Sequence, residues 1–169
     1  MDALEAIRQR RTVKTYLPEP VPREQLERVL DAAKWAPCHR MSEPWRFRVI
    51  GAVTLGRLVS VAGGGAGKLM RAPTLVVASY VPSPLPLHAA EDEQAAACAV
   101  YAVLLAAEAE GLASYWRTPG ILRSAEGRAA LQLPSEERTI GLLHFGTPRT
   151  AAPEAPARQG TDAYVTWLD

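Results

Sequence analysis

The sequence predicts a single α+β domain over residues 1–169. The helices and strands expected along the chain follow one another as α-α-β-(α)-β-α-β-α-β, without the regular β-α-β alternation of a doubly wound sheet. One long helix, expected at residues 91–110, is apolar nearly all round in "AAACAVYAVLLAA", which is typical of a helix at the centre of a core. With 169 residues, 48% of them hydrophobic, the chain is long enough to bury such a core.

The first part of the chain predicts two helices separated by a proline-rich loop. Leu4 and Ile7 lie three apart within a helix at residues 2–10. The three prolines of "TYLPEPVP" predict loop or extended chain between the helices. The second helix begins with Pro22 and stops at Pro37. Its apolar residues recur at helical spacing and form one stripe, made of Leu26, Val29, Leu30 and Ala33.

Two strands follow. "WRFRVIG", residues 45–51, alternates, and the expected faces are Phe47 and Val49 on one side and Arg46, Arg48 and Ile50 on the other. The continuous apolar run "APTLVVASYV" predicts a buried strand at residues 72–81. Between the two strands we expect a short helix at 53–61 and a turn at the glycines 63–65.

The second half begins with a loop, "PSPLPLHAAEDE", ahead of the long helix, which Gly111 is expected to cap. A short strand at 112–118, a helix at 124–131 and a strand at 138–146 come next. A Pro/Ala-rich arm, residues 148–169, ends the chain with four apolar side chains: Tyr164, Val165, Trp167 and Leu168. Such residues are unusual on a free tail, so we expect the arm to pack on another surface, such as a second subunit.

Composition excludes several classes of protein. The net charge of +1 argues against nucleic-acid binding, which normally needs a basic excess. No window reaches about 18 consecutive apolar residues, as a membrane span would need, and the acidic start "MDALE" does not resemble a signal peptide. Cys38 and Cys98 lie far apart, without the spacing of a zinc site or a disulfide framework. We therefore expect a cytoplasmic, reduced protein with no metal site.

Most local motifs favour a structural role. "GGGAGKL" lacks two residues of a phosphate-binding P-loop, because Ala62 and Leu69 stand where glycine and Ser or Thr are needed. The three histidines, His39, His88 and His144, show no metal-ligand spacing. "RRT" at Arg10, Arg11 and Thr12 has two interpretations: solvated charge on a helix surface, or a seat for a phosphate where the helix ends.

Several motifs in a fixed order resemble the nitroreductase family of FMN-dependent oxidoreductases. That family reads R-R-S-[VI]-R, P-[VI], A-A-x-x-A-P-S and N-x-Q-P-W-x-F, and this chain has "RRTVK", "PVP", "AAKWAPC" and "MSEPWRF". "AAACAVYAVLLAAEAEGLASYWRT" and "IGLLHFGTP" resemble the family's central helix, its G-[LIF]-[GA]-x-x-W segment and its last core strand. The short length and His39, in A-P-x-H, are similar to a compact branch of the family.

The resemblance implies an α+β fold with a mostly antiparallel sheet, in an obligate homodimer with exchanged arms and two FMN molecules at the interface. It implies hydride transfer from NADH or NADPH, through FMN, to nitroaromatic, quinone-like or similar acceptors in a ping-pong reaction. No catalytic side chain is expected, because the flavin carries the chemistry. Relatives that fragment reduced flavin or remove halogen, and an FMN-binding protein without turnover, remain alternatives.

The resemblance also assigns the FMN-binding residues. It implies that Arg10, Arg11 and Thr12 bind the phosphate and ribityl end of FMN. It places Trp35 and His39 of the other subunit beside the flavin. Trp116, Arg117 and Thr118 are implied along the isoalloxazine, partly through backbone groups, and Arg158 of the arm near the phosphate. The chain departs from the family pattern at several positions: Thr12 stands for Ser and keeps the hydroxyl, and Cys38, Met41 and Glu43 stand for Ser, Asn and Gln. The last two lie near the expected flavin and leave the acceptor open.

Overall fold

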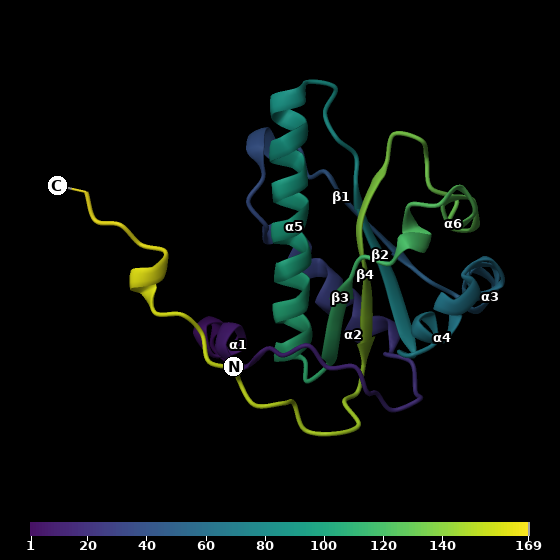
Figure 1. Ribbon diagram of the computed structural model, residues 1–169, viewed down its shortest axis with the longest axis horizontal. Helices are drawn as coiled ribbons and strands as arrows, with labels where there is room; N and C mark the ends of the chain where they lie inside the picture. The colour runs from purple at the N-terminus through teal and green to yellow at the C-terminus, as the bar shows by residue number, and fades with distance from the viewer. Residues whose placement is uncertain (169) are drawn as a thin grey trace.

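The computed structural model describes residues 1–168 and contains one four-stranded sheet with helices on both faces (Figure 1). The strands lie in the spatial order β1-β2-β4-β3, and every neighbouring pair is antiparallel. Their bounds are β1 (Trp45–Val49), β2 (Thr74–Tyr80), β3 (Ala113–Arg117) and β4 (Arg138–Gly146). The expected α+β fold with a mostly antiparallel sheet is confirmed.

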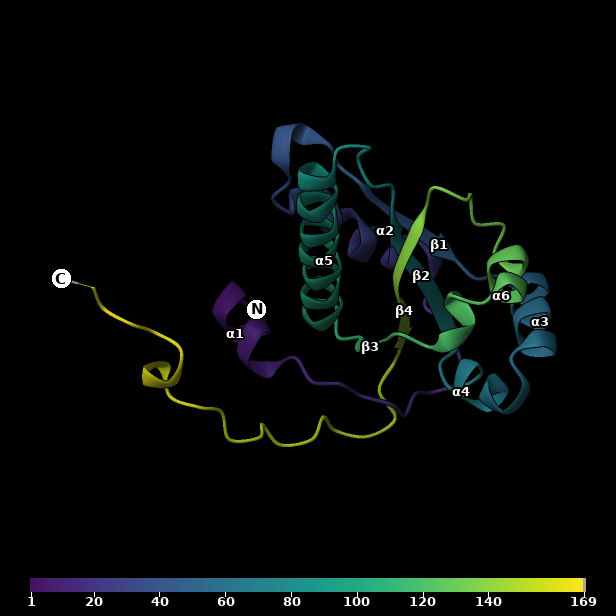
Figure 2. The same ribbon diagram turned by 45° about the horizontal axis from the view of Figure 1, so that its top comes forward.

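The helices divide between the two faces of the sheet. One face carries α1 (Ala3–Gln9), α2 (Arg23–Asp31) and α5 (Pro86–Ala109), and the other carries α3 (Ala52–Val61), α4 (Ala66–Leu69) and α6 (Ala125–Ala130) (Figures 1 and 2). Short 3₁₀ turns join them: η1 (Ala32–Trp35), η2 (His39–Met41), η3 (Gly63–Gly65), η4 (Gly120–Leu122) and η5 (Thr161–Ala163).

The sheet separates two hydrophobic clusters, and β2 contributes to both. Val76 and Ala78 pack with α2 and α5, while Leu75 and Val77 pack with α3 and α4. All residues of β2 are buried. This explains why the strand has no polar alternation in the sequence, and it confirms the predicted buried strand.

The main helix, α5, starts five residues earlier than the residue 91 that the sequence predicted. Pro86 occupies its first turn, where a missing backbone N–H costs no helical hydrogen bond, so part of the expected loop is helical. Its other end is as predicted. Gly111 has φ 74°, its N–H donates to Glu108 O (3.0 Å), and Leu112 N–H donates to Ala107 O (2.8 Å), which completes a Schellman cap.

One face of α5 remains open, contrary to the expectation that the helix is buried on most sides. Leu87 is 72% exposed and Tyr101 is 40% exposed, and Cys98 lies between them on the same face. The opposite face carries small and branched residues such as Ala96, Ala99 and Val103, which are fully buried. The open face is therefore an apolar surface without a partner among the described residues.

Two further elements differ slightly from the sequence prediction. Helix α2 begins at Arg23, with Pro22 just before it, and tightens at Ala32 into η1 ahead of Pro37. Strand β1 ends at Val49, which is exposed although it shares its face with the half-buried Phe47, because β1 is the edge of the sheet. The expected alternation holds at Arg46 and Phe47, but Arg48 is half-buried because it pairs with the buried Glu137.

The arm is fixed only at its start. Leu17 N–H donates to Thr147 O (2.9 Å) and Arg149 N–H donates to Thr15 O (3.2 Å). Beyond these bonds the arm leaves the body of the molecule (Figures 1 and 2), and Trp167 and Leu168 are each 90% exposed. Within residues 1–168, none of the helices combines the length and the apolar character needed to cross a membrane.

Candidate functional site

The basic segment at residues 10–14 is attached to the open edge of the sheet beside β3. Thr12 forms a parallel bridge with Ser114, and Val13 N–H donates to Ser114 O (3.2 Å). The preceding helix α1 is stopped by Arg10, whose backbone is no longer helical. The structure therefore brings the predicted residues Arg10, Arg11 and Thr12 beside the strand that carries Trp116 and Arg117.

The two arginines of this segment have different surroundings. Arg11 Nη1 donates to Arg8 O (2.6 Å) and Arg10 O (2.8 Å), so its guanidinium caps the C-terminal end of α1. Arg11 Nε and Ser114 Oγ are buried and have no hydrogen-bond partner among the described residues. Buried polar groups are normally satisfied, so these two unpaired atoms on adjoining segments are consistent with a polar ligand such as a phosphate.

Trp116 is held in place by β4. Its Nε1 donates to Ile140 O (3.1 Å), and its indole lies over Gly141, where any Cβ would overlap Trp116 Nε1. The indole is therefore engaged within the chain, which leaves mainly backbone groups of β3 for a ligand. The next residue, Arg117, lines a pocket of 200 Å³ at the end of β3. Thr118 follows and is exposed.

Two lysines that the sequence analysis did not select also contribute to this region. Lys14 Nζ lies 5.1 Å from the centre of the Tyr115 ring, which is a cation–π contact. Lys68 lines the same pocket as Arg117. Both had a signal in the sequence, since Lys14 ends "RRTVK" and Lys68 belongs to "GGGAGKL", the segment dismissed as a P-loop.

The interior beneath this basic region keeps its titratable groups neutral. Burial, followed by the charges of Arg117 and Arg71, lowers the pKa of His144 to about 4. Both ring nitrogens of His144 are buried without a partner among the described residues. Burial also raises the pKa of Tyr16, so its hydroxyl stays protonated and donates to Val13 O (2.6 Å). Neither buried group therefore adds a charge beneath the basic segment.

The other predicted residues lie elsewhere in the same chain. His39 packs against the N-terminal part of α5, with its ring centre 6.1 Å from that of His88. The basic segment adjoins β3, which follows the C-terminal end of α5. From Glu91 to Ala109 the helix rises roughly 27 Å, so His39 does not reach the basic segment of its own chain.

Trp35 and Arg158 form no hydrogen bond, ion pair or cation–π contact with the basic segment within residues 1–168. The Trp35 ring is 79% exposed and is contacted by Lys34 Nζ, 5.5 Å from its centre. Arg158 is exposed on the projecting part of the arm. Within one chain, the structure thus assembles six of the predicted residues, Arg10, Arg11, Thr12, Trp116, Arg117 and Thr118, and leaves Trp35, His39 and Arg158 outside the group.

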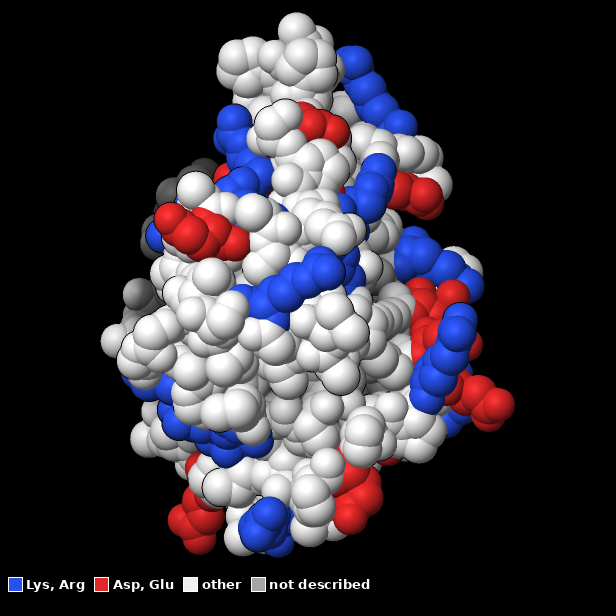
Figure 3. Space-filling view, turned by 90° about the vertical axis from the view of Figure 1, so that its right-hand side faces the viewer, with Lys and Arg blue, Asp and Glu red and all other residues white. Residues whose placement is uncertain are grey.

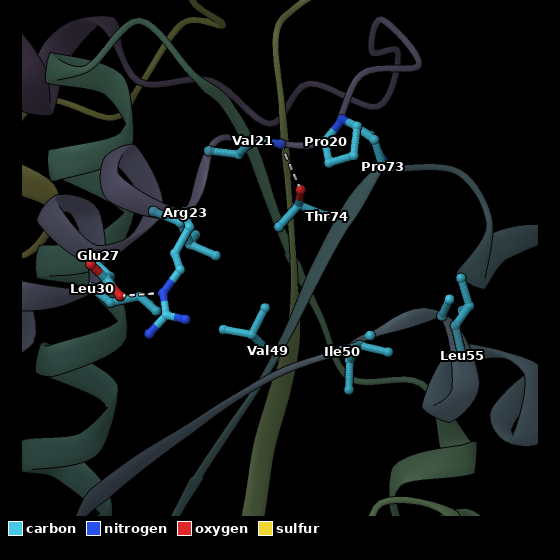
Figure 4. Close-up of a pocket in the computed structure, with 13 residues that line it drawn as sticks. Pro20, Val21, Arg23, Glu27, Leu30, Val49, Ile50, Leu55, Pro73 and Thr74 are labelled. Carbon is cyan, nitrogen blue, oxygen red and sulfur yellow. Dashed lines mark hydrogen bonds and ion pairs between the residues drawn. The ribbon is translucent and has the colours of Figure 1, made fainter.

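An apolar groove lies away from these residues. It has a volume of 680 Å³ and lies between α2, the outer edge of β1 and the start of α3 (Figure 4). Leu26, Leu30 and Val49 supply apolar walls, while Arg23 and Glu27 pair with each other at its rim (Nε to Oε1, 2.7 Å). None of the residues predicted to bind FMN lines this groove.

Charged side chains on another side of the molecule show no comparable concentration. Figure 3 views the side that carries α3 and α6, and basic and acidic residues are interspersed there around a largely uncharged centre. This agrees with the net charge of +1. The positive charge of residues 10–14 and 117 is therefore a local feature and not part of a generally basic surface.

Comparisons with known proteins agree on one family. Residues 7–147 match the model of the Nitroreductase family. The chain is 32% identical to an Escherichia coli (strain K12) protein, YdjA, which is named as an inferred NAD(P)H nitroreductase, over 99% of this chain and 100% of that protein.

Two solved structures share the fold. An inferred nitroreductase from Desulfovibrio desulfuricans, solved in complex with FMN, is 27% identical with a TM-score of 0.81, covering 98% of this chain and 96% of that one. Iodotyrosine deiodinase bound to FMN and 3-iodo-L-tyrosine is 25% identical with a TM-score of 0.79, covering 97% and 99%. The match of sequence motifs, fold and length establishes that this chain belongs to the nitroreductase family.

Proposed function

We propose that this protein is an FMN-dependent oxidoreductase that transfers a hydride from NADH or NADPH, through bound FMN, to nitroaromatic, quinone-like or related acceptors. The observation that carries the proposal is the attachment of residues 10–14 to β3, which gathers Arg10, Arg11 and Thr12 beside Trp116 and Arg117. A cytoplasmic location, as expected from the sequence, is part of the proposal.

The residues of this region fit FMN. A phosphate monoester carries nearly two negative charges, and a guanidinium can hold it with paired hydrogen bonds. Arg10 has no side-chain hydrogen bond within residues 1–168, and Arg11 Nε and Ser114 Oγ are buried and unpaired there. Thr12 contributes an exposed hydroxyl. These groups support a phosphate at this position in preference to solvated surface charge.

The remaining groups suit the other end of FMN. Trp116, Arg117 and Thr118 offer the backbone of β3 and its end, and Lys14 and Lys68 add positive charge. When bound, FMN supplies the two-electron chemistry, and the protein supplies position and electrostatics. Positive charge beside the flavin favours its reduced form, which carries more negative charge than the oxidised form.

A second copy of the chain completes the proposed site. His39 and Trp35 are both exposed, and His39 lies too far from the basic segment of its own chain to share one FMN with it. The open apolar face of α5, with Leu87 and Tyr101, supports a large contact between two copies. We propose a homodimer in which His39 and Trp35 of one copy lie against the FMN held by Arg10 to Thr12 of the other.

The arm supports the same dimer. Its apolar end, Tyr164 to Leu168, projects from the body of its own chain and is exposed (Figures 1 and 2). The groove beside β1 offers apolar walls and a free strand edge. We propose that the arm of each copy packs in this groove on its partner. A chain ended at residue 160 should then give a light-scattering mass below that of two chains, and a full-length protein that binds FMN as a single chain would contradict the dimer.

The test of the activity follows the colour of the flavin. The purified protein should be yellow, with about one FMN per chain. Anaerobic NADH or NADPH should bleach it, and a nitroaromatic compound should restore the colour. Purified protein that contains no flavin, and takes up none when FMN is added, would contradict the proposal.

The likeness to a deiodinase favours one second candidate, reductive removal of halogen. The same bleached protein, mixed with 3-iodotyrosine, distinguishes it: reoxidation with release of iodide would favour dehalogenation, whereas reoxidation by the nitro compound alone favours the first proposal. Bound FMN that neither nicotinamide cofactor bleaches would indicate an FMN-binding protein without turnover.

A further inference from the structure

The segment at residues 38–43, between η1 and β1, has an unusual backbone. Arg40, Met41 and Glu43 have positive φ values of 52°, 54° and 41°, and they are three of the four non-glycine residues with positive φ within residues 1–168. An L-residue in this region is disfavoured because its Cβ approaches the backbone. The conformation therefore has to be held by contacts from the rest of the molecule.

One buried carboxylate provides the main contacts. Asp92, on α5, is 5% exposed. Its Oδ1 accepts from Ser42 Oγ (2.8 Å), and its Oδ2 accepts from the backbone N–H of Ser83 (2.8 Å). Asp92 thus ties both the 38–43 segment and the loop before α5 to the helix, through hydrogen bonds to a charged group, which are stronger than neutral ones.

A second set of contacts orients His39 within the segment. Its ring stacks on His88, with 27° between the ring planes, and its Nδ1 lies 3.9 Å from Glu91 Oε1. His88 and Glu91 lie one turn apart on α5, so they face the segment together. The space enclosed by these groups is only 80 Å³, which is large enough for water but not for a cofactor.

The same segment presents its outer side chains to solvent. Met41 is 77% exposed and His39 is about half exposed, while Ser42 bonds inward to Asp92. A strained backbone that is fixed from inside and displays an apolar and an aromatic side chain is typical of a binding surface. In the proposed dimer this surface lies beside the partner's FMN.

We infer that Asp92 is a positioning residue of the FMN site: through Ser42 it holds residues 38–43 in the backbone conformation, left-handed at Arg40, Met41 and Glu43, that presents His39 and Met41 to the FMN bound by a second copy. The inference rests on the proposed function for the identity of the ligand. Asp92 itself touches neither the cofactor nor the acceptor, since it is buried behind the segment.

The experiment uses Ser42→Ala in the full-length, FMN-loaded protein, because this change removes one bond to Asp92 and leaves the buried carboxylate bonded to Ser83. Amide hydrogen exchange at residues 39–43 should rise about tenfold, the loss expected for a hydrogen bond to a charged group. The dissociation constant of FMN should rise about three- to tenfold, and the visible circular dichroism of the bound flavin should change. The mass of the dimer should stay the same.

Two further variants separate positioning from general destabilisation. Ser42→Thr keeps the hydroxyl and should restore exchange, FMN affinity and the flavin spectrum. Glu93→Gln, the next residue on α5, faces Tyr80 (hydroxyl to Oε2, 3.0 Å) and should leave all three unchanged. Asp92→Asn, which can no longer accept at both oxygens, should exceed the effect of Ser42→Ala.

The outcomes are distinguishable. Faster exchange in Ser42→Ala with unchanged FMN affinity and spectrum overturns the inference, because the bond would then be structural only. Unchanged amide hydrogen exchange in Ser42→Ala also overturns the inference. So does a Ser42→Thr variant that binds FMN as weakly as Ser42→Ala does. A wild-type protein that binds no FMN overturns the proposed function together with this inference. If the wild type binds FMN and Ser42→Ala binds it with the same affinity, the inference alone is overturned.

Discussion

The two ends of α5 carry different halves of the proposed FMN site, and different kinds of contact hold them. At the C-terminal end, residues 12 and 13 are fixed by backbone pairing with Ser114 of β3. At the N-terminal end, residues 38–43 are tied to α5 by the side-chain bond from Ser42 to Asp92. Backbone pairing does not depend on side-chain identity, whereas side-chain bonds do.

This difference has a physical consequence for mutations. A side chain on the basic segment can be removed without displacing the segment, so its loss should affect the ligand directly. A side chain that anchors residues 38–43 should affect the ligand through the position of other residues. His39 faces a carboxylate, Glu91, whereas no ion pair is formed by residues 10–14 within residues 1–168. Four predictions test this contrast.

The largest effect is expected for Arg10→Ala on the basic segment. Loss of a charge-assisted contact to the phosphate costs about 1.5–3 kcal/mol, so the dissociation constant of FMN should rise about 10- to 100-fold. Thermal stability without FMN should change little, because the backbone pairing remains. Titration of the apoprotein by flavin fluorescence measures the affinity. Arg8→Ala is the matched control, because Arg8 is an exposed arginine two residues earlier, in α1. An equal loss of affinity in both variants would remove Arg10 from the site.

Gly141→Ala should disturb the same end through packing. A Cβ at residue 141 would overlap the Trp116 indole, which must then leave its hydrogen bond to Ile140 O. Overpacking of this kind costs about 1–3 kcal/mol of unfolding free energy, and FMN affinity should fall with it because β3 carries Trp116 and Arg117. Urea denaturation measures the loss. Gly56→Ala, which meets open space, should not destabilise the protein, and equal stability of the two variants would contradict the packing argument.

The neutral His144 makes stability depend on pH. Its pKa is about 4 in the folded protein and about 6.5 when unfolded. As pH falls, the imidazole is therefore protonated first in the unfolded state, and the free energy of unfolding should fall below pH 6.5. This decrease should end near pH 4, where His144 of the folded protein is protonated as well. Between pH 7 and pH 5 this contribution amounts to about 2 kcal/mol. His144→Leu should lose that part of the slope, while His88→Gln should keep it; identical slopes in wild type and His144→Leu would disprove the burial of a neutral imidazole.

The smallest effect is expected for His39→Ala at the other end. Loss of one hydrogen bond or stacking contact costs about 0.5–1.5 kcal/mol, so FMN affinity should fall roughly 3- to 10-fold, with the dimer intact. Because His39 and Arg10 of one chain serve different sites, a mixed dimer of His39→Ala and Arg10→Ala chains should contain one fully intact site. Titration of the exchanged mixture should then show a fraction with wild-type affinity. Absence of that fraction would place both residues in the site of the same chain.

Much of the fold follows from local signals in the sequence. The apolar run of β2 predicts a buried strand, Gly111 predicts the end of α5, and the motif order identifies the family, because each signal depends on residues close together in the chain. The start of α5 was missed because Pro86 suits both a loop and a first helical turn. The open face of α5 was also missed, since an apolar helix surface looks the same in sequence whether its own chain or a second copy covers it.

The site shows the same division. The sequence by itself determined that Arg10, Arg11 and Thr12 form a phosphate-binding candidate and that His39 marks a second region, because these residues belong to continuous motifs. Only the tertiary structure decided which of them meet. The parallel bridge between Thr12 and Ser114 joins residues about a hundred positions apart, and the bond from Ser42 to Asp92 joins residues 50 positions apart. Such pairings depend on how the sheet and α5 pack together, and a pattern of neighbouring residues carries no information on that packing.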